Sequence, residues 1–262
     1  MNLDSIFVRY INLDRRVDRN EDVKKKFVDI LGFNPQKIQR FSAIDGINII
    51  DELKNKNYIG DEIIKILQTK KTIAKKAELS CLLSHYFLLQ QIITDETISD
   101  DSLIFIFEDD FFINSEYLKS IKLSDIIDKL MGSKINEENN WDMIYFGGRF
   151  KPNFIPSNNN ITKFFTHQND NFFLRIKGNG SDWDRTTHNY LVKKKNIKNI
   201  LNCILYHFAN TIKIVVQIDS LYNSLSSKLH MLDYFPHLFY SPINYTSDIQ
   251  NSKNTIDTTN IN

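Results

Sequence analysis

The sequence has few cysteines, no long apolar run and almost no net charge, and each shortage excludes a class of protein. Cys81 and Cys203 are its two cysteines and lie far apart, so their spacing gives neither a zinc-finger set nor a disulfide framework. No stretch reaches membrane-spanning length and the N-terminus lacks a signal-peptide pattern, so we expect a cytoplasmic protein with no membrane partner. The formal charge of +1 gives no field that attracts nucleic acid.

The usual phosphate-binding loops are missing as well. The sequence contains no G-x-x-x-x-G-K-[ST] motif, and no G-x-G-x-x-G motif follows an expected strand. The glycines at Gly147-Gly148 and at 178–180 are too sparse to replace them. These absences disfavour kinases, ATPases and dehydrogenases.

What the sequence does contain is an alternation of strand and helix patterns. Ser5–Leu13 is β-branched and aromatic, which predicts a strand, and Arg19–Leu31 predicts a helix ending at a glycine. Apolar residues at helical spacing predict a long helix at Lys75–Thr94, and Glu116–Leu130 also has a helical pattern. The near-continuous apolar run at Leu103–Phe107 is typical of a strand covered on both faces of a sheet. The alternation predicts an α/β fold with a mixed central sheet flanked by helices.

The length and the composition of the C-terminal end predict the domain organisation. A chain of 262 residues can bury a large core as one domain, which we place at residues 1–250. From residue 251 the chain is rich in Asn and Thr and has little to bury, so residues 251–262 are expected to form a disordered tail.

Three adjacent acids, Glu108, Asp109 and Asp110, directly follow the apolar strand. Adjacent carboxylates repel one another, and burying an unpaired one is costly, so the cluster needs a compensating positive charge. Carboxylate oxygens are ligands of Mn²⁺ or Mg²⁺, and such an ion commonly holds a diphosphate as well. The plain alternative is that Asp110 caps the following helix or lies in a solvated turn. The position at the carboxyl end of a sheet strand favours the metal site.

Eight segments in order along the chain carry further motifs, and they span nearly all of it. They are YINLDRRVDR (10–19), FSAIDG (41–46), AELSCLLSH (77–85), FIFEDDF (105–111), WDMIYFGGR (141–149), TTHNYLV (186–192), QIDSL (217–221) and SPINYTSDIQNS (241–252). Together they resemble glycosyltransferase family 25, which includes bacterial lipooligosaccharide galactosyltransferases and animal procollagen hydroxylysine galactosyltransferases. The WDMIY segment and the set Tyr245, Ser247, Asp248 and Ser252 are closer to the collagen-modifying branch.

The resemblance implies a GT-A type nucleotide-sugar-binding fold, a UDP-galactose or UDP-glucose donor, and Mn²⁺ or Mg²⁺. It implies Glu108 and Asp110 as metal ligands, and Asp219 and Asp248 as catalytic residues. Asp219 would be the general base or an acceptor anchor, and Asp248 a second contact to metal or sugar. The donor-binding residues that it implies are Asn12, Leu13, Arg15, Arg16, Ala43, Asp45, Gly46, Ser84, His85, Asp109 and Thr187. Arg19 and Tyr190 also lie in matching motifs.

The implied activity is transfer of galactose or glucose to hydroxylysine or galactosyl-hydroxylysine of a collagen-like protein. A giant virus with its own collagen-like proteins would provide a setting for that activity outside a secretory pathway. Two alternatives stay open: a UDP-sugar glycosyltransferase acting on a glycan or lipooligosaccharide, and a non-catalytic nucleotide-sugar-binding module. A nucleotidyltransferase is disfavoured because it requires a richer phosphate loop. The oligomeric state is open, a homo-oligomer included.

Overall fold

The computed structural model describes residues 3–70, 72–132, 141–148, 164–166, 173–176, 188–211, 215–235, 237–241 and 254–261. The α-helices of these segments are α1 (Val17–Lys25), α2 (Ile49–Asn55), α3 (Glu62–Lys70), α4 (Lys76–Thr94), α5 (Ser115–Leu118), α6 (Leu123–Met131), α8 (Lys194–Asn210) and α9 (Ile218–Ser224). None of these helices has both the length and the apolar character needed to cross a membrane.

The main sheet mixes parallel and antiparallel strands. Its strands are β1 (Phe7–Asn12), β2 (Ile38–Ser42), β4 (Leu103–Glu108), β6 (Met143–Tyr145), β8 (Phe164–Thr166), β9 (Phe173–Ile176), β10 (Asn189–Lys193) and β11 (Met231–Phe235). They pair in the order β2-β1-β4-β10-β6-β11-β9-β8. β1 is parallel to β2 and β4, whereas β10 is antiparallel to β4 and β6. The predicted α/β class with a mixed central sheet is confirmed.

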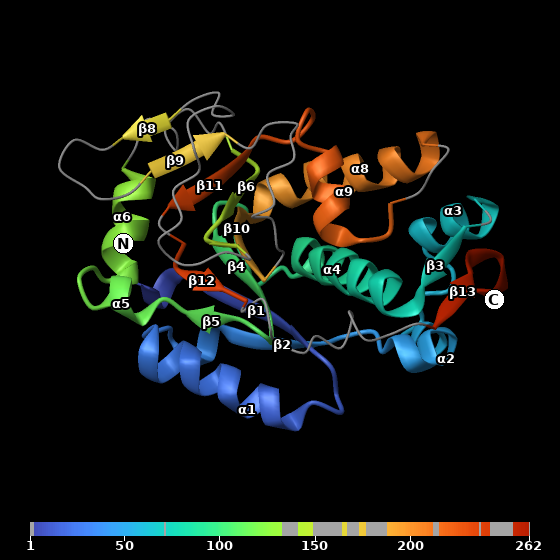
Figure 1. Cartoon of the computed structure of the whole chain (residues 1–262), viewed down its shortest axis with the longest axis horizontal. Helices are drawn as coiled ribbons and strands as arrows, with labels where there is room; N and C mark the ends of the chain where they lie inside the picture. The colour runs from blue at the N-terminus through green and yellow to red at the C-terminus, as the bar shows by residue number, and fades with distance from the viewer. Residues whose placement is uncertain are drawn as a thin grey trace.

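The pleat of β4 divides the interior into two hydrophobic cores. Successive side chains of a strand point to opposite faces of the sheet. Ile104 and Ile106 therefore belong to one core, which includes residues of α4 and α8, while Phe105 and Phe107 belong to the other, which includes Phe27 just beyond α1. Figure 1 shows α1 on one side of these strands and α4 with α8 on the other. The apolar run of β4 is thus explained by helices on both faces.

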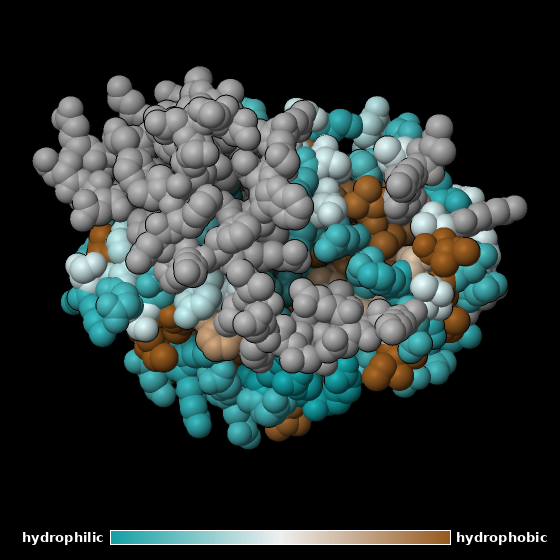
Figure 2. Space-filling model, viewed as in Figure 1, coloured by the Kyte–Doolittle hydropathy of each residue, from teal (hydrophilic) through white to brown (hydrophobic). Residues whose placement is uncertain are grey.

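The outward face of α1 is hydrophilic. Its sequence, VDRNEDVKK, buries Arg19 and Val23 and leaves most of its charged side chains in solvent. This surface is the largely teal lower part of Figure 2. A helix of this kind covers a sheet with a narrow apolar stripe and keeps its charges hydrated.

The predicted helix at Glu116–Leu130 is wrong in its middle, where the structure has two helices, α5 and α6. Asn114 caps α5 by accepting a hydrogen bond from the Tyr117 amide. The Ser120 hydroxyl donates to the Tyr117 carbonyl at 2.7 Å, a local bond that competes with helix continuation. The chain therefore turns before α6, which packs Ile126, Ile127 and Leu130 into the core.

The expected disordered tail is wrong for residues 254–261. Strand β13 (Thr255–Asp257) pairs with β3 (Ile73–Lys75), and Thr258 and Ile261 are completely buried. Composition gave little sign of this order because two isoleucines and one threonine carry the packing. The domain boundary at residue 250 stays a prediction. Residues 254–261 pack against residues that this prediction assigns to the catalytic domain.

Candidate functional site

The acid cluster lies where three parallel strands end. Parallel strands place their carboxyl ends at one edge of a sheet, and β1, β2 and β4 meet there with Asn12 paired to Ser42 and Ile11 paired to Glu108. The antiparallel strand β10 begins at the same edge, where the Glu108 amide donates to the carbonyl of His188 at 2.9 Å. Residues distant in the sequence therefore converge at this edge.

A cavity of about 310 Å³ opens at this edge between the β1 and β2 ends and the first turns of α4. Both predicted metal ligands, Glu108 and Asp110, line it. Eight of the eleven predicted donor-binding residues line it too: Asn12, Leu13, Arg15, Ala43, Asp45, Gly46, Ser84 and Asp109.

The remaining predicted residues lie elsewhere. Arg16 is not among the described residues that line the cavity, and its guanidinium pairs with Asp18 at 2.8 Å. His85 is completely buried behind the cavity wall. Asp219 lies half-buried in the first turn of α9, and its charge contributes to raising the pKa of His188. Thr187 and Asp248 lie outside the described residues.

The loop after β2, which borders the cavity, makes two close contacts with α4. The Ser84 hydroxyl accepts a hydrogen bond from the Ile44 amide at 2.9 Å, which fixes the loop after β2 against the helix. A Cβ added at Gly46 would lie 3.0 Å from the backbone of Lys76 and of Ala77. Glycine at this position therefore permits the loop to approach the start of α4.

Asp109 is held by the β1 side of the site. Its carboxylate accepts from Asn12 Nδ2 at 2.7 Å and from Arg19 Nη1 at 2.9 Å. The Arg19 and Asp109 side chains are only 9% and 10% exposed. Burial raises the pKa of Asp109, and the attraction of Arg19 and the hydrogen bond from Asn12 offset only part of that shift. The Asp109 carboxylate is therefore engaged in the ion pair with Arg19, although the residue also lines the cavity.

Glu108 and Asp110 instead face two histidines. His85 hydrogen-bonds through Nε2 to Glu108 at 3.2 Å and through Nδ1 to the Tyr190 hydroxyl at 2.9 Å. His188 Nδ1 lies 3.0 Å from Asp110 Oδ1 and 3.8 Å from Glu108 Oε2. Burial alone raises the pKa of both carboxyls, but the nearby histidines outweigh it and hold both below their usual range.

The donor atoms of Glu108, Asp110 and His188 fit a divalent cation. One ligand atom from each lies within 4.8 Å of the others. Asp110 Oδ1 and His188 Nδ1 are buried and lie 3.0 Å apart as an ion pair, with no further hydrogen-bond partner among the described residues. Two carboxylate oxygens and one imidazole nitrogen form a ligand set that suits Mn²⁺.

His188 did not emerge from the sequence as a site residue. It lies in the TTHNYLV segment, where only Thr187 and Tyr190 matched the family motif. Its closeness to Glu108 comes from the antiparallel pairing of β10 with β4, two strands about eighty residues apart in the chain. A histidine placed just before a buried strand was the available signal, but the pairing partner of that strand could not be read from one sequence.

The charge of His188 leads to a pH-dependent stability of the metal-free protein. Burial lowers the pKa of His188, but the attraction of Asp110 and Glu108 outweighs burial and raises the pKa to about 9. A histidine with a raised folded-state pKa stabilises fully below its unfolded pKa of 6.5 and loses this contribution as the pH rises through the folded value. We expect the free energy of unfolding in EDTA to fall by about 3 kcal/mol between these two pH values. Urea unfolding followed by circular dichroism measures it.

The control for this pH dependence is His188→Gln. The amide does not titrate, so the decline in stability across this pH interval should flatten in that variant. An equal decline in both proteins would show that another group is responsible.

Comparison with known proteins agrees with the geometry. The family model described as "Glycosyltransferase family 25 (LPS biosynthesis protein)" matches residues 4–221. No curated protein matches the chain closely enough to count as a relative. The matched region contains β1, β2, α4, β4, β10 and the start of α9, which together position the site. Because the match covers most of the sequence, the chain belongs to glycosyltransferase family 25.

Proposed function

We propose that this glycosyltransferase moves galactose or glucose from a UDP-sugar to hydroxylysine or galactosyl-hydroxylysine of a collagen-like protein, with the help of a divalent cation. The observation that carries the proposal is the gathering of Glu108, Asp110 and His188 beside a cavity at the carboxyl edge of the sheet. Family membership supports sugar transfer, and the cavity supports a site for the donor.

Glu108, Asp110 and His188 would hold the cation, Mn²⁺ or Mg²⁺. When bound, such an ion neutralises charge on a leaving diphosphate. The chain prepares for it by keeping both carboxyls ionised, since their pKa values are held below the usual range. A cation at this position would replace the contact between Asp110 Oδ1 and His188 Nδ1, and His188, whose pKa is raised to about 9, would give up its Nδ1 proton on binding.

Arg15 and the start of α4 would bind the diphosphate and Asp45 the ribose. Arginine donates two charge-assisted hydrogen bonds to a phosphate, and amides at a helix N-terminus attract anions. Arg15 now pairs with Asp45 at 2.8 Å, with its side chain 42% exposed. Arg15 is the more exposed partner of this pair, and a pair of this kind contributes little stability, so its rearrangement toward a ligand would cost little.

Asp219 would be the general base or the group that anchors the acceptor. A general base must come within hydrogen-bond distance of the acceptor hydroxyl. Asp219 lies in the first turn of α9, close enough to the acid cluster for its charge to contribute to raising the pKa of both Cys81 and His188. Asp248, as a second contact to metal or sugar, and Thr187, at the donor, complete the proposed site.

Two sequence features bear on the acceptor. The WDMIY segment and the motif around Asp248 resemble the collagen-modifying branch, whereas the matching family is described by LPS biosynthesis. A glycan or lipooligosaccharide acceptor is therefore the second candidate. A non-catalytic sugar-nucleotide-binding module is the third, and the complete set of acids at 108–110 argues against it.

A UDP-release screen tests these alternatives. UDP-galactose and UDP-glucose are each incubated with a hydroxylysine collagen peptide, its galactosylated form and a free sugar acceptor, in Mn²⁺ or in EDTA. We expect UDP release with one donor and a collagen peptide in Mn²⁺, and none in EDTA. Release with the free sugar alone would favour the glycan acceptor, and equal release in EDTA would contradict the metal site.

A further inference from the structure

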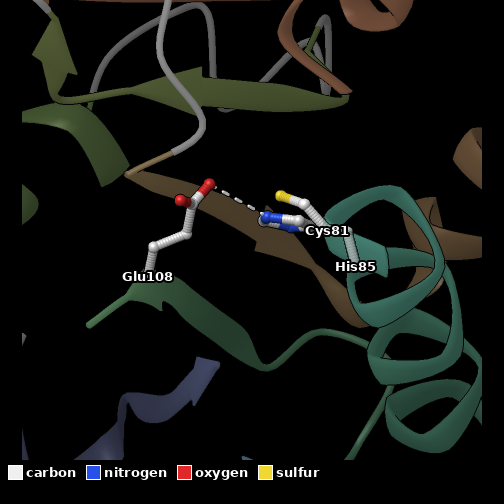
Figure 3. A group of neighbouring side chains, drawn as sticks. All are labelled: Cys81, His85 and Glu108. Atoms are coloured by element: carbon white, nitrogen blue, oxygen red, sulfur yellow. Dashed lines mark hydrogen bonds and ion pairs between the residues drawn. The ribbon is translucent and has the colours of Figure 1, made fainter. Parts of the chain in front are cut away.

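A second cluster of ligand atoms lies on the α4 side of Glu108. Cys81 and His85 are four residues apart on α4, so both side chains project from the same face of the helix. Their Sγ and ring nitrogen lie within 4.8 Å of each other and of a Glu108 carboxylate oxygen. Figure 3 shows the sulfur and the imidazole both directed toward that carboxylate.

His85 is already oriented as a metal ligand requires. Its Nδ1 lies 2.9 Å from the Tyr190 hydroxyl, and its Nε2 is the atom that faces Glu108 at 3.2 Å. A tyrosine hydroxyl can donate or accept, so it can accept from Nδ1–H when a cation takes the Nε2 lone pair. A hydrogen bond to the other ring nitrogen is the usual means by which proteins orient a ligating histidine.

The three atoms form a softer ligand set than the one at Asp110. Thiolate, imidazole and carboxylate together are typical of Zn²⁺, whereas carboxylate and water suit Mg²⁺ and Mn²⁺. Cys81 and Glu108 both line the cavity, so an ion can reach the cluster from solvent and keep one position open there.

We propose that Cys81, His85 and Glu108 form a binding site for Zn²⁺, and that its occupation inhibits sugar transfer. Binding exchanges the thiol proton of Cys81 for the metal. Glu108 belongs to both clusters, so a carboxylate engaged by Zn²⁺ is withdrawn from the cation bound with Asp110 and His188. The inhibition, but not the binding, rests on the proposed function.

Cobalt binding tests the site without any measurement of activity. Co²⁺ substitutes for Zn²⁺, and a bound thiolate gives a sulfur-to-cobalt charge-transfer band in the near ultraviolet. We expect the full chain to show this band, added Zn²⁺ to remove it, and Cys81→Ser to lack it. Cys203→Ser is the matched control and keeps the band, because Cys203 lies on α8 and is not among the described residues that line the cavity.

A second variant tests the orientation of His85. Tyr190→Phe removes the hydroxyl partner of Nδ1, and loss of such a partner lowers metal affinity by roughly 10-fold or more. Competition with a zinc-sensitive dye measures the change. A wild-type chain without the band, or a Cys81→Ser variant that keeps it, overturns the site.

The inhibition is measured as the ratio of UDP release with and without Zn²⁺, in excess Mn²⁺, within each variant. We expect a low ratio in the wild-type chain and in Cys203→Ser, and a ratio close to one in Cys81→Ser. Equal suppression in all three would show that Zn²⁺ acts through other groups and would overturn the inhibitory role. A cobalt band in a chain that never releases UDP would leave the zinc site standing and contradict the proposed function instead.

Discussion

Asp110→Asn is expected to lower kcat/KM for sugar transfer by about 1000-fold, a loss of about 4 kcal/mol of transition-state stabilisation. The substitution keeps the shape of the side chain but removes the charge that attracts a cation. Asp110 Oδ1 is buried beside His188, so no solvent-exposed group can replace it at this position. UDP release at donor concentrations well below KM measures kcat/KM, and calorimetric titration with Mn²⁺ measures the accompanying loss of affinity.

The matched control for Asp110→Asn is Asp101→Asn, since Asp101 lies before β4 and Asp110 lies after it. Asp101 precedes β4, is 84% exposed and pairs with Lys195 on the surface. Asp101→Asn makes the same chemical change far from the cavity and should leave the rate unchanged. Circular dichroism and thermal unfolding confirm that both variants are folded. Full activity in a folded Asp110→Asn protein would contradict the assignment of this carboxylate to the metal site.

The architecture around the site follows from patterns that one sequence displays. The apolar run of β4 is buried because α1 and α4 cover its two faces, and a run of this kind predicts such a position without any alignment. The helical spacing in α4 predicts its extent, with the expected and observed ends differing by one residue at most. Both features depend on local periodicity, which long elements express strongly.

The separate roles of the three acids could not be predicted from local sequence pattern. Adjacent in sequence, they differ in their partners: Asp109 faces Arg19 and Asn12, whereas Glu108 and Asp110 face histidines. The partners come from segments up to about a hundred residues away, and only the strand order brings them together. The sequence could therefore predict an acid cluster but not the separate role of each carboxylate.

The order of the C-terminal segment could not be predicted from its composition either. Its composition predicts disorder, yet Ile256 and Ile261 join the core and Asn254 lines the cavity. The Thr72 amide donates to the Thr258 hydroxyl at 2.9 Å, a contact between residues far apart in the chain. A few apolar side chains are enough to order a segment when it can pair with an existing strand, as β13 does with β3. Composition gives no information about such a pairing.

Arg19→Met is expected to have the largest effect on stability, a loss of about 3 kcal/mol in the free energy of unfolding at neutral pH. Methionine preserves much of the apolar stem but leaves Asp109 buried beside two other acids, with the hydrogen bond from Asn12 still in place. Burial already raises the pKa of Asp109, and losing Arg19 raises it further. An acid with a raised folded-state pKa is tolerated when protonated, so the loss should shrink as the pH falls and grow as it rises. Urea unfolding at several pH values measures both effects.

The double variant Arg19→Met with Asp109→Asn separates the ion pair from simple packing. If the cost of Arg19→Met comes from a stranded buried charge, neutralising that charge restores much of the lost stability and removes the pH dependence. Arg16→Met, at the N-cap of α1, is the matched control, because Arg16 pairs with the exposed Asp18 and should produce a much smaller change. A double variant that is less stable than Arg19→Met alone, with the same pH dependence, would show that Arg19 acts through packing. The Asp109 carboxylate would then be a candidate further ligand for a cation in the cavity.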